Sequence, residues 1–485
     1  MNYETVIGLE VHVHLKTKSK LFCGCSIEFG SEPNSNICPV CTGQPGVLPV
    51  LNKKAVEYAI LTGIATNCKI AKYSIFARKN YFYPDLPKNY QISQYELPLC
   101  EKGYLEIEID GKIKKIGITR IHLEEDAGKL LHTIGSQILD YSLVDYNRCG
   151  ISLLEIVSEP DIFSPDEAYQ YLTNLKAILK YIGISDCDME KGSLRCDANI
   201  SLRAVGEKKL GIKVELKNMN SFKAIKDALN YEIKRQERLL DLNEKIVQDT
   251  RLWDEKLGTT ISMRSKEQSH DYRYFPEPDL VPIEIDEKFL NEVRKNLVEL
   301  PVVRKKRFSE LFGLSDYDAE VLTSEKSLAD YFENCLSLLT SQFSILAVAK
   351  PLSNWITTEL LGKLNAENKD ITFSPVSSKN LAEMIKLISD GTISGKIAKT
   401  VFEQMFKNGK SASEIIKEQG LVQISDEKEI EKLVDEVIAE NQKAVAEFKL
   451  GKQQAIGSLI GAIMKKSGGK ANPKIANEIL KKKLV

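Results

Sequence analysis

The segment Ile7–Leu15 combines a strand pattern with side chains that bind metals or move protons. Its apolar residues alternate with Glu10, His12 and His14. Because successive side chains of a strand point to opposite faces, we expect the carboxylate and both imidazoles on one face. Such groups coordinate divalent metals and transfer protons. A solvated sheet face with coincidental histidines would explain this segment alone equally well.

Three further segments predict strands with acids and cations on their polar faces, although each face alone could simply be solvated. Ile116–Lys129 begins as a strand and ends in three consecutive acids, which repel one another unless they are solvated or share a cation. In Ser193–Arg203 and Lys213–Lys217, apolar residues alternate with polar and charged ones. Oxygen ligands suit Mg²⁺, and cations suit the charge that develops in phosphoryl transfer. The candidate residues are Glu10, His12, Glu124, Glu125, Asp197 and Glu215, with the cations Arg195, Arg203 and Lys217.

The chain lacks the loops that most often hold nucleotide phosphates. Neither a Gly-x-x-x-x-Gly-Lys-[Ser/Thr] loop nor a Gly-x-Gly-x-x-Gly after a strand occurs. Any nucleotide is therefore expected to be held by metals and residues of the sheet.

Composition places the chain among soluble globular proteins. Its 485 residues suggest about three domains of roughly 150 residues. No run approaches the roughly 20 apolar residues of a membrane helix, and no signal or transit peptide precedes the first strand, so we expect a cytoplasmic protein without membrane contact. Because the net charge is −1, nucleic-acid binding would have to come from local patches.

Four of the ten cysteines are spaced as in a metal knuckle. Cys23 and Cys25 form a Cys-x-Cys pair, and Cys38 and Cys41 form a Cys-x-x-Cys pair. Four thiolates suit a tetrahedral structural zinc site. Disulfides and an iron–sulfur cluster are the alternatives; a reducing compartment argues against the disulfides.

The order of elements predicts an α+β protein. Up to about residue 290, strands mix with helices, one of which begins in a capping box at Ser164 and Glu167 and ends near Gly183. Another begins at Asn220 or Ser221. Beyond about residue 295 the strand signals fade, short amphipathic helices follow between residues 375 and 420, and another helix begins near Val434.

Two other features suggest nucleic acid. From Lys449 to the end, nine lysines face one acid, and the small-residue segments Gly457–Gly461 and Ser467–Pro473 would allow close approach of the backbone to a ligand. The segments Arg78–Asp85 and His270–Asp279, which we expect to be loops, mix cations with aromatic rings that can stack on bases or shape a polar channel. A solvated lysine-rich tail and loops packed over a sheet are the alternative interpretations.

Seven motifs together resemble one family. They closely resemble the B subunit of the three-subunit glutamyl/aspartyl-tRNA amidotransferases, the GatB/GatE family, over the whole chain and most strongly before residue 290. The motifs are Ile7–His12, Arg78–Asp85, His122–Gly128, Glu155–Asp161, Gly192–Asn199, Glu215–Asn218 and Asp271–Pro278.

The resemblance implies a fold and a function. A catalytic cradle similar to the antiparallel-sheet fold of glutamine synthetase is expected over residues 1–292, a helical linker domain over 293–408, and a YqeY-like tRNA-binding tail over 409–485. The family uses ATP and Mg²⁺ to phosphorylate the side-chain carboxylate of Glu-tRNA(Gln) or Asp-tRNA(Asn), which ammonia then amidates. The A subunit, a glutaminase, supplies the ammonia, and a C subunit completes the heterotrimer.

The resemblance also refines the site. It places catalytic Mg²⁺ ligands among Glu10, His12, Glu125, Asp197 and Glu215, leaves open which of the neighbouring Glu124 and Glu125 binds metal, and suggests that the other guides ammonia. It makes Lys79 and Tyr81 candidates for the ammonia tunnel or the tRNA acceptor end, assigns Arg195, Arg203 and Lys217 to the nucleotide, and gives His14 no role. Zinc at the four cysteines would be structural.

Two other interpretations remain. The E subunit of the archaeal glutamate-specific enzyme shares the cradle, but it carries an extra domain for which 485 residues leave no obvious room. A tRNA-binding scaffold without chemistry would use the same acids structurally, and ATP turnover would distinguish it from an enzyme.

Overall fold

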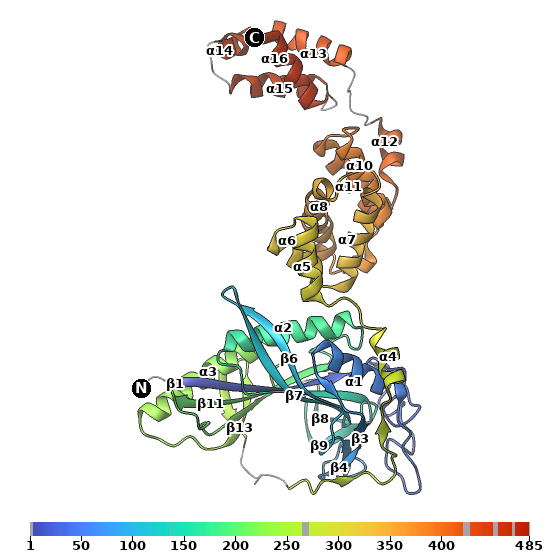
Figure 1. Ribbon diagram of the computed structural model, residues 1–485, viewed down its shortest axis with the longest axis vertical. Helices are drawn as coiled ribbons and strands as arrows, with labels where there is room; N and C mark the ends of the chain where they lie inside the picture. The colour runs from blue at the N-terminus through green and yellow to red at the C-terminus, as the bar shows by residue number, and fades with distance from the viewer. Residues whose placement is uncertain are drawn as a thin grey trace. The chain divides into compact units, whose positions relative to one another are not determined.

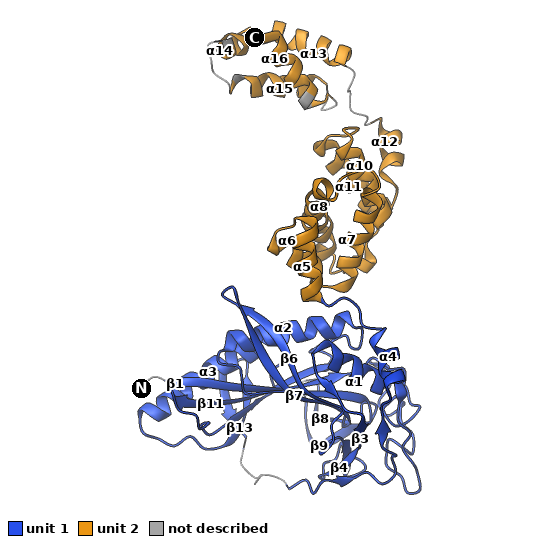
Figure 2. Cartoon of the chain, viewed as in Figure 1, with its two compact units in different colours: residues 1–300 blue, residues 301–485 orange. Residues whose placement is uncertain are grey.

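The computed structural model divides the chain into two compact units, residues 1–300 and 301–485 (Figures 1 and 2). It describes residues 3–135, 137–263, 271–420, 427–449, 454–467 and 471–484. Within these residues, no helix combines the length and the apolar character that crossing a bilayer requires.

The first unit is built on a nine-stranded sheet in the order β14-β13-β12-β11-β1-β10-β7-β6-β2. Neighbouring strands are antiparallel except for the parallel pair β12 and β13. The long central strands lie side by side although they come from distant parts of the sequence, which brings the polar faces of all four predicted strands together. The strands are β1 (Tyr3–His14), β2 (Lys69–Ile70), β6 (Cys100–Ile109), β7 (Lys112–Glu125), β10 (Ser152–Ser158), β11 (Leu194–Ala204), β12 (Val214–Lys217), β13 (Asp249–Asp254) and β14 (Thr259–Ser262).

The helices α1 (Lys53–Ala65), α2 (Pro165–Tyr181) and α3 (Phe222–Asp241) pack on one face of this sheet (Figure 1). α1 packs on β6 and β7, α2 on β6, and α3 on β11. The residues of β1 alternate accordingly, since Leu9 and Val11 are fully buried in the core beneath these helices while Glu10 and His12 remain partly accessible. The short helix α4 (Glu287–Arg294) packs on α1.

The helix starts agree with the sequence signals. Ser164 caps α2 by accepting a hydrogen bond from the Glu167 N–H at 3.1 Å, but the Glu167 carboxylate accepts from the Phe163 N–H instead of closing a capping box. Gly183 follows α2 with φ +72°, and Ser221 caps α3. The predicted helices are therefore confirmed, and the capping box is only half formed.

Small sheets lie beside the main one: β3 (Tyr73–Ser74) with β16 (Ile283–Glu284), β8 (Lys129–Ile134) with β9 (Gln137–Asp145), and β4 (Ala77–Asn80) between β5 (Tyr90–Ser93) and β15 (Phe275–Pro276). The last sheet joins the two aromatic segments expected to be loops. That expectation was wrong for Arg78–Asn80, which pairs with β5, and for Phe275–Pro276, which pairs with Arg78 and Ala77.

The second unit is helical and contains two apolar cores. One core is formed by residues 308–416 and the other by residues 430–484. Proline in α8 is followed by a π-helical turn, as expected where a ring interrupts the hydrogen-bond ladder. The helices are α5 (Pro301–Phe312), α6 (Asp316–Thr323), α7 (Lys326–Leu339), α8 (Ile345–Asn354), η1 (Trp355–Leu360), α9 (Leu361–Ala366), η2 (Ile371–Phe373), α10 (Ser378–Ser389), α11 (Gly395–Asn408), α12 (Ala412–Gln419), α13 (Glu427–Glu440), α14 (Gln442–Lys449), α15 (Ala455–Lys466) and α16 (Pro473–Leu484).

The prediction of an α+β protein with a helical C-terminal part is confirmed, and the described elements beyond residue 285 are all helical. The finer domain boundaries stay predictions. The compact units divide between residues 300 and 301, and α12 packs in the core of residues 308–416.

Candidate active site

Five side chains from three adjacent strands meet on the polar face of the main sheet. The Nε2 atom of His12 lies 3.5 Å from carboxylate oxygens of both Glu10 and Glu155, and 3.8 Å from Glu124. His122 lies 3.7 Å from Glu124 and 3.6 Å from Glu155. We call Glu10, His12, His122, Glu124 and Glu155 the acid–histidine cluster.

The acid–histidine cluster fits divalent metal ions. Two groups, Glu10–His12–Glu155 and His122–Glu124–Glu155, each bring three ligand atoms within 4.8 Å of one another. His122, Glu124 and Glu155 are buried, and the Nδ1 atom of His122 has no hydrogen-bond partner. Three carboxylates around two imidazoles leave negative charge that a hard cation would neutralise.

The charges of the cluster act strongly on one another. Burial lowers the pKa of His12, but the hydrogen bond to Glu155 and the charge of Glu124 outweigh burial and raise this pKa to about 9. Burial raises the pKa of Glu10, and the neighbouring Glu155 carboxylate adds to that shift. The carboxylates around His12 therefore favour the protonated form of its imidazole.

Sequence reasoning identified Glu10, His12 and Glu124 but not His122 and Glu155 as site residues. His122 lies two residues before Glu124 on β7, so the period of the strand could have indicated it. Glu155 is the one charged residue in the otherwise apolar and small-polar sequence of β10. Because charged residues are rarely buried without a partner, this pattern indicates a paired or functional carboxylate.

The strands β11 and β12 add a second charged group beside the cluster. Lys217 Nζ lies 2.5 Å from Asp197 and 3.1 Å from Glu215, and Glu215 also accepts from the Thr250 hydroxyl at 2.9 Å. Asp197 is the register partner of Glu10, so this group continues the polar face. Arg203 lies further along β11, where it pairs with Glu4 at 2.6 Å.

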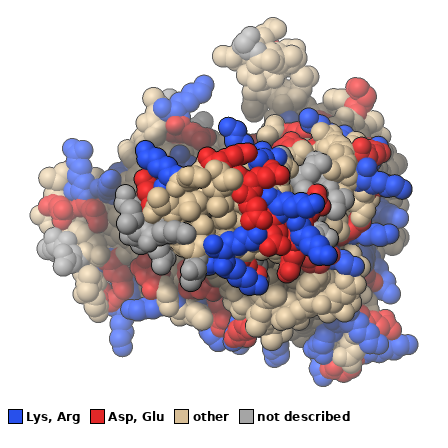
Figure 3. Space-filling view, turned by 90° about the horizontal axis from the view of Figure 1, so that it is seen from above, with Lys and Arg blue, Asp and Glu red and all other residues tan. Residues whose placement is uncertain are grey.

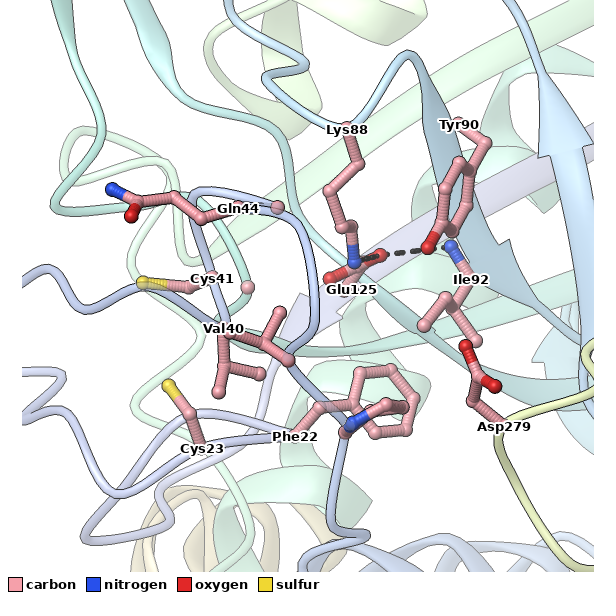
Figure 4. A pocket seen from close by; sticks show the side chains of 14 residues that line it. Phe22, Cys23, Val40, Cys41, Gln44, Lys88, Tyr90, Ile92, Glu125 and Asp279 are labelled. Carbon is pink, nitrogen blue, oxygen red and sulfur yellow. Dashed lines mark hydrogen bonds and ion pairs between the residues drawn. The ribbon is translucent and has the colours of Figure 1, made fainter.

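Glu125 is directed away from the acid–histidine cluster. Its carboxylate forms a buried ion pair with Lys88 and accepts the Ile92 N–H at 2.8 Å (Figure 4). Neighbouring residues of a strand face opposite ways, and β7 extends through Glu125, so Glu124 alone of the two reaches the cluster. We call the hollow around this ion pair the Glu125 pocket.

The third consecutive acid, Asp126, fixes the end of β7 and binds two residues considered at the sequence level. It lies 2.6 Å from His14 Nε2 and 3.0 Å from Arg195, with Arg148 at 3.4 Å. Burial raises the pKa of Asp126, but Arg195 and the hydrogen bond from His14 hold it well below its usual range. Arg195 is therefore already ion-paired with the Asp126 carboxylate in this structure.

Lys79 and the aromatic residues form a layer beside the cluster. The ammonium of Lys79 lies 4.9 Å from the ring of Tyr272, and burial, which lowers its pKa, is outweighed by the charge of Glu124, which raises it. Tyr81 contacts Tyr272 edge to face, while the half-exposed Tyr95 stacks on Tyr274 at 4.0 Å. The described rings of both aromatic segments thus face one region. His270 lies outside the described residues.

A cavity of about 290 Å³ opens beside the cluster, between β1, β10 and β11 and the loop that leads into β12. Gly8 has open space where a side chain would be, and Asn199 has a buried Oδ1 atom without a hydrogen-bond partner. The loop lies close, because a Cβ atom on Gly211 would come within 2.0 Å of the Leu202 carbonyl oxygen. Val6 and Leu210 add apolar lining.

The four predicted knuckle cysteines come together, and no disulfide joins them. The Sγ atoms of Cys23, Cys25, Cys38 and Cys41 lie within 4.8 Å of one another. A hydrogen bond from Cys23 lowers the pKa of Cys41 to about 4 although burial opposes the shift. Four sulfurs at this spacing fit a tetrahedral zinc ion.

The basic tail is only partly described. Residues 450–453, 468–470 and 485 lie outside the described residues. Gly457–Gly461 lies inside α15, and both of its glycines have open space where a side chain would be, so close approach of a ligand to this backbone stays a prediction. Lys466 and Lys483 pair with acids of α13, while Lys465, Lys481 and Lys482 are exposed. Basic and acidic side chains are interspersed on the face shown in Figure 3.

Comparisons with known proteins agree with these features. The GatB/GatE catalytic domain family matches residues 5–291, and the GatB domain family matches residues 330–484. The B subunit of the aspartyl/glutamyl-tRNA(Asn/Gln) amidotransferase from Carboxydothermus hydrogenoformans is 58% identical over 482 residues, which cover 99% of both chains. The proteins of the same name from Thermoanaerobacter sp. and Geobacter sulfurreducens are 56% and 55% identical over 484 residues, which cover 100% of each chain.

Proposed function

Because this chain belongs to the GatB/GatE family, we propose that it is the B subunit of an aspartyl/glutamyl-tRNA(Asn/Gln) amidotransferase. It phosphorylates the side-chain carboxylate of Glu-tRNA(Gln) or Asp-tRNA(Asn) with ATP and then amidates it with ammonia. The enzyme is thus a carbon–nitrogen ligase of translation, and we expect it in the cytoplasm. The observation that carries the proposal is the acid–histidine cluster on the polar sheet face of a family member.

The acid–histidine cluster would hold catalytic Mg²⁺. Glu10, His12, Glu124 and Glu155 supply oxygen and nitrogen ligands in two adjacent groups, with His122 closing the second. Bound Mg²⁺ would neutralise charge as the phosphoryl group moves between ATP and the substrate carboxylate. Asp197 and Glu215 hold Lys217 beside the cluster, so this ammonium is positioned to bind phosphate oxygens.

The cavity beside Gly8 would receive the nucleoside of ATP. It lies next to Glu10 on the same face, so a nucleotide that reaches the cluster with its phosphates extends into this cavity with its base. The absent side chain of Gly8 leaves room, the apolar walls suit a base, and the unpartnered Asn199 Oδ1 can accept a hydrogen bond from the nucleoside. Arg203, further along the same strand, would limit the far end of the site.

The Glu125 pocket would handle ammonia. The A subunit of the heterotrimer, a glutaminase, would deliver it, and Glu125 can take a proton from an arriving ammonium ion when Lys88 releases the carboxylate. This assigns metal binding to Glu124 and ammonia to Glu125, and places Lys79 and Tyr81 where ammonia and the tRNA acceptor end approach the cluster.

The remaining parts would position tRNA and stabilise the fold. The stacked Tyr95–Tyr274 pair offers an aromatic platform for a base near the acceptor end, and the lysines of α16 offer phosphate contacts. The proposed domains are a glutamine-synthetase-like cradle over residues 1–292, a helical linker over 293–408 and a YqeY-like tail over 409–485. Structural zinc at the four cysteines and a C subunit complete the assembly.

ATP hydrolysis by the reconstituted three-subunit complex tests the proposal. Turnover should require Mg²⁺ and either Glu-tRNA(Gln) or Asp-tRNA(Asn), and it should be lost in Glu124→Ala and strongly reduced in Glu215→Ala. Uncharged tRNA provides the matched control. Turnover that does not depend on the misacylated tRNA, or that survives Glu124→Ala, would contradict the assignment of phosphorylation to this cluster.

A further inference from the structure

The four-cysteine site and the Glu125 pocket share a wall (Figure 4). Cys23 and Cys41 line one side of the pocket, and Lys88 and Glu125 line the other; Gly43 also lines it. Gly43 has φ +69°, and a Cβ atom there would lie 2.3 Å from Cγ of Lys88. The backbone of the cysteine loop therefore lies directly against the stem of the lysine that pairs with Glu125.

Lys20 lies behind this wall and is completely buried. Its Nζ atom lies 3.5 Å from Cys41 Sγ and 3.2 Å from the Tyr146 carbonyl oxygen, to both of which it donates. A buried ammonium is stable only beside negative charge. Zinc bound by four thiolates carries two net negative charges, so the metal-loaded site supplies the charge that a lysine in this place requires.

The segment Tyr146–Ile151 connects Lys20 with Glu125. On one side, Tyr146 accepts from Lys20, and the thiol of Cys149 donates to the Cys41 carbonyl oxygen at 3.3 Å. On the other side, the Gly150 N–H donates to Asp126, and the Asp126 N–H donates to Ile151.

Gly150 lies between the two sides and lines the Glu125 pocket together with Cys41 and Glu125. It has φ +81°, and a Cβ atom there would lie 3.4 Å from Cβ of Cys41 and 3.9 Å from a carboxylate oxygen of Glu125. A displacement of the cysteine loop would therefore reach the Glu125 carboxylate through one residue.

We propose that Lys20 is a positioning residue that couples the metal state of the four-cysteine site to the Glu125 pocket. Its ammonium offsets the charge of the metal-bound thiolates and holds Tyr146–Ile151 against the residue that receives ammonia. The functional meaning of this coupling rests on the proposed role of Glu125, whereas the coupling itself does not. Loss of the metal would loosen the Lys88–Glu125 pair without disturbing the acid–histidine cluster.

The rate of zinc release tests whether the charge of Lys20 stabilises the metal-loaded four-cysteine site. The full-length chain loaded with zinc is mixed with the chromogenic chelator 4-(2-pyridylazo)resorcinol, and the release rate is compared among Lys20→Met, Lys20→Arg and the exposed control Lys18→Met. Lys20→Met should release zinc about ten- to a hundredfold faster than the wild type, as is usual when an outer-shell partner is lost. Lys20→Arg should recover most of the retention. Equal release by Lys20→Met and wild type, or by Lys20→Met and Lys20→Arg, overturns the proposal.

Hydrogen exchange on the wild-type chain tests the coupling and needs no variant to fold. The Ile92 N–H donates to Glu125, so it reports directly on that carboxylate. Removal of zinc should make this amide exchange about tenfold faster, as expected for weakening one hydrogen bond, and added zinc should reverse the change. Amides of β11 should not change. Unaltered exchange at Ile92, or a chain that binds no zinc, overturns the proposal. Neither experiment uses tRNA or ATP, so failure of the proposed amidotransferase function would appear separately.

Discussion

Glu124 and Glu125 are neighbours in sequence but belong to chemically opposite compartments. Glu124 faces two histidines and two further carboxylates, whereas Glu125 faces one lysine and one backbone N–H. The alternation of a strand places them on different sides of β7. Two adjacent residues of one type can therefore serve two steps of a reaction without competing for the same cation.

The two compartments also differ in how their charge is balanced. The acid–histidine cluster has more carboxylates than cations and so favours an added metal ion, while the Glu125 pair is already neutral. A metal site needs this excess negative charge. A carboxylate that takes a proton from ammonium needs instead a partner that can release it. The difference predicts that substitutions on the two sides fail in different ways.

Glu155→Ala should have the largest effect, because Glu155 belongs to both metal groups of the cluster. We expect tRNA-dependent ATP hydrolysis to fall about a thousandfold, near the upper end for removal of one group that stabilises charge in the transition state. The exposed Glu108 on β6 is a suitable control, and Glu108→Ala should retain wild-type turnover. Retention of hydrolysis in Glu155→Ala would move the metal away from this cluster.

Glu125→Gln should separate the two compartments. Amide formation with glutamine as donor should fall about a hundredfold, the lower range for loss of a general base, while tRNA-dependent ATP hydrolysis persists. The amount of phosphate released per amide formed, measured in the same reaction, should therefore rise sharply. A parallel loss of hydrolysis and amidation would show that Glu125 acts in phosphorylation, and the division of labour between Glu124 and Glu125 would fail.

Sequence reasoning predicted the site residues that follow from the alternation of side chains along a strand. It missed the residues that join the site only through the order of strands in the sheet. Glu10 and His12 share a face with Asp197 and Asn199 through a period of two, which the sequence displays. Glu155 lies at the centre of the acid–histidine cluster because β10 lies between β1 and β7. The sequence does not reveal this strand order. The sequence showed that Glu124 and Glu125 cannot face the same way. Their contacts in the fold, His122 for Glu124 and Lys88 for Glu125, show which of them faces the acid–histidine cluster.

The four-cysteine site shows the same limit. Its ligands follow from spacing alone, because Cys-x-Cys and Cys-x-x-Cys pairs are local patterns. Nothing in the sequence connects them with Lys20 or Lys88, which reach them only through the fold. The starts of α2 and α3 and the glycine end of α2 are encoded locally and agree with the sequence, although the capping box at Ser164 is only half formed.

Gly8→Val tests whether the nucleotide extends along the acid–histidine face. The new side chain would enter open space, so the strand should fold, but the cavity beside β1 would be filled. We expect the KM for ATP to rise about tenfold, equivalent to about 1.4 kcal/mol, with kcat little changed. Gly362→Val places the same side chain at another open glycine, in the helical unit, and should leave this KM unchanged. An unchanged KM in Gly8→Val would place the nucleoside elsewhere.

The smallest effect is expected when both charges of the Glu125 pocket are removed together. Lys88→Met or Glu125→Leu alone leaves one buried charge without its partner and should lower the free energy of unfolding by about 3–5 kcal/mol. The double variant should lie within about 1 kcal/mol of the wild type, because a buried ion pair contributes little beyond its own desolvation cost.

Urea unfolding can measure this in a Trp355→Phe background, where Trp253 is the remaining tryptophan and reports on the first unit. A double variant as unstable as the single ones would mean that the pair is needed to hold the fold. Near-wild-type stability combined with lost amidation would mean that Lys88 and Glu125 serve the reaction with ammonia and not the fold. The carboxylates of the acid–histidine cluster differ from this pair, because their charge is balanced only when a metal ion is bound.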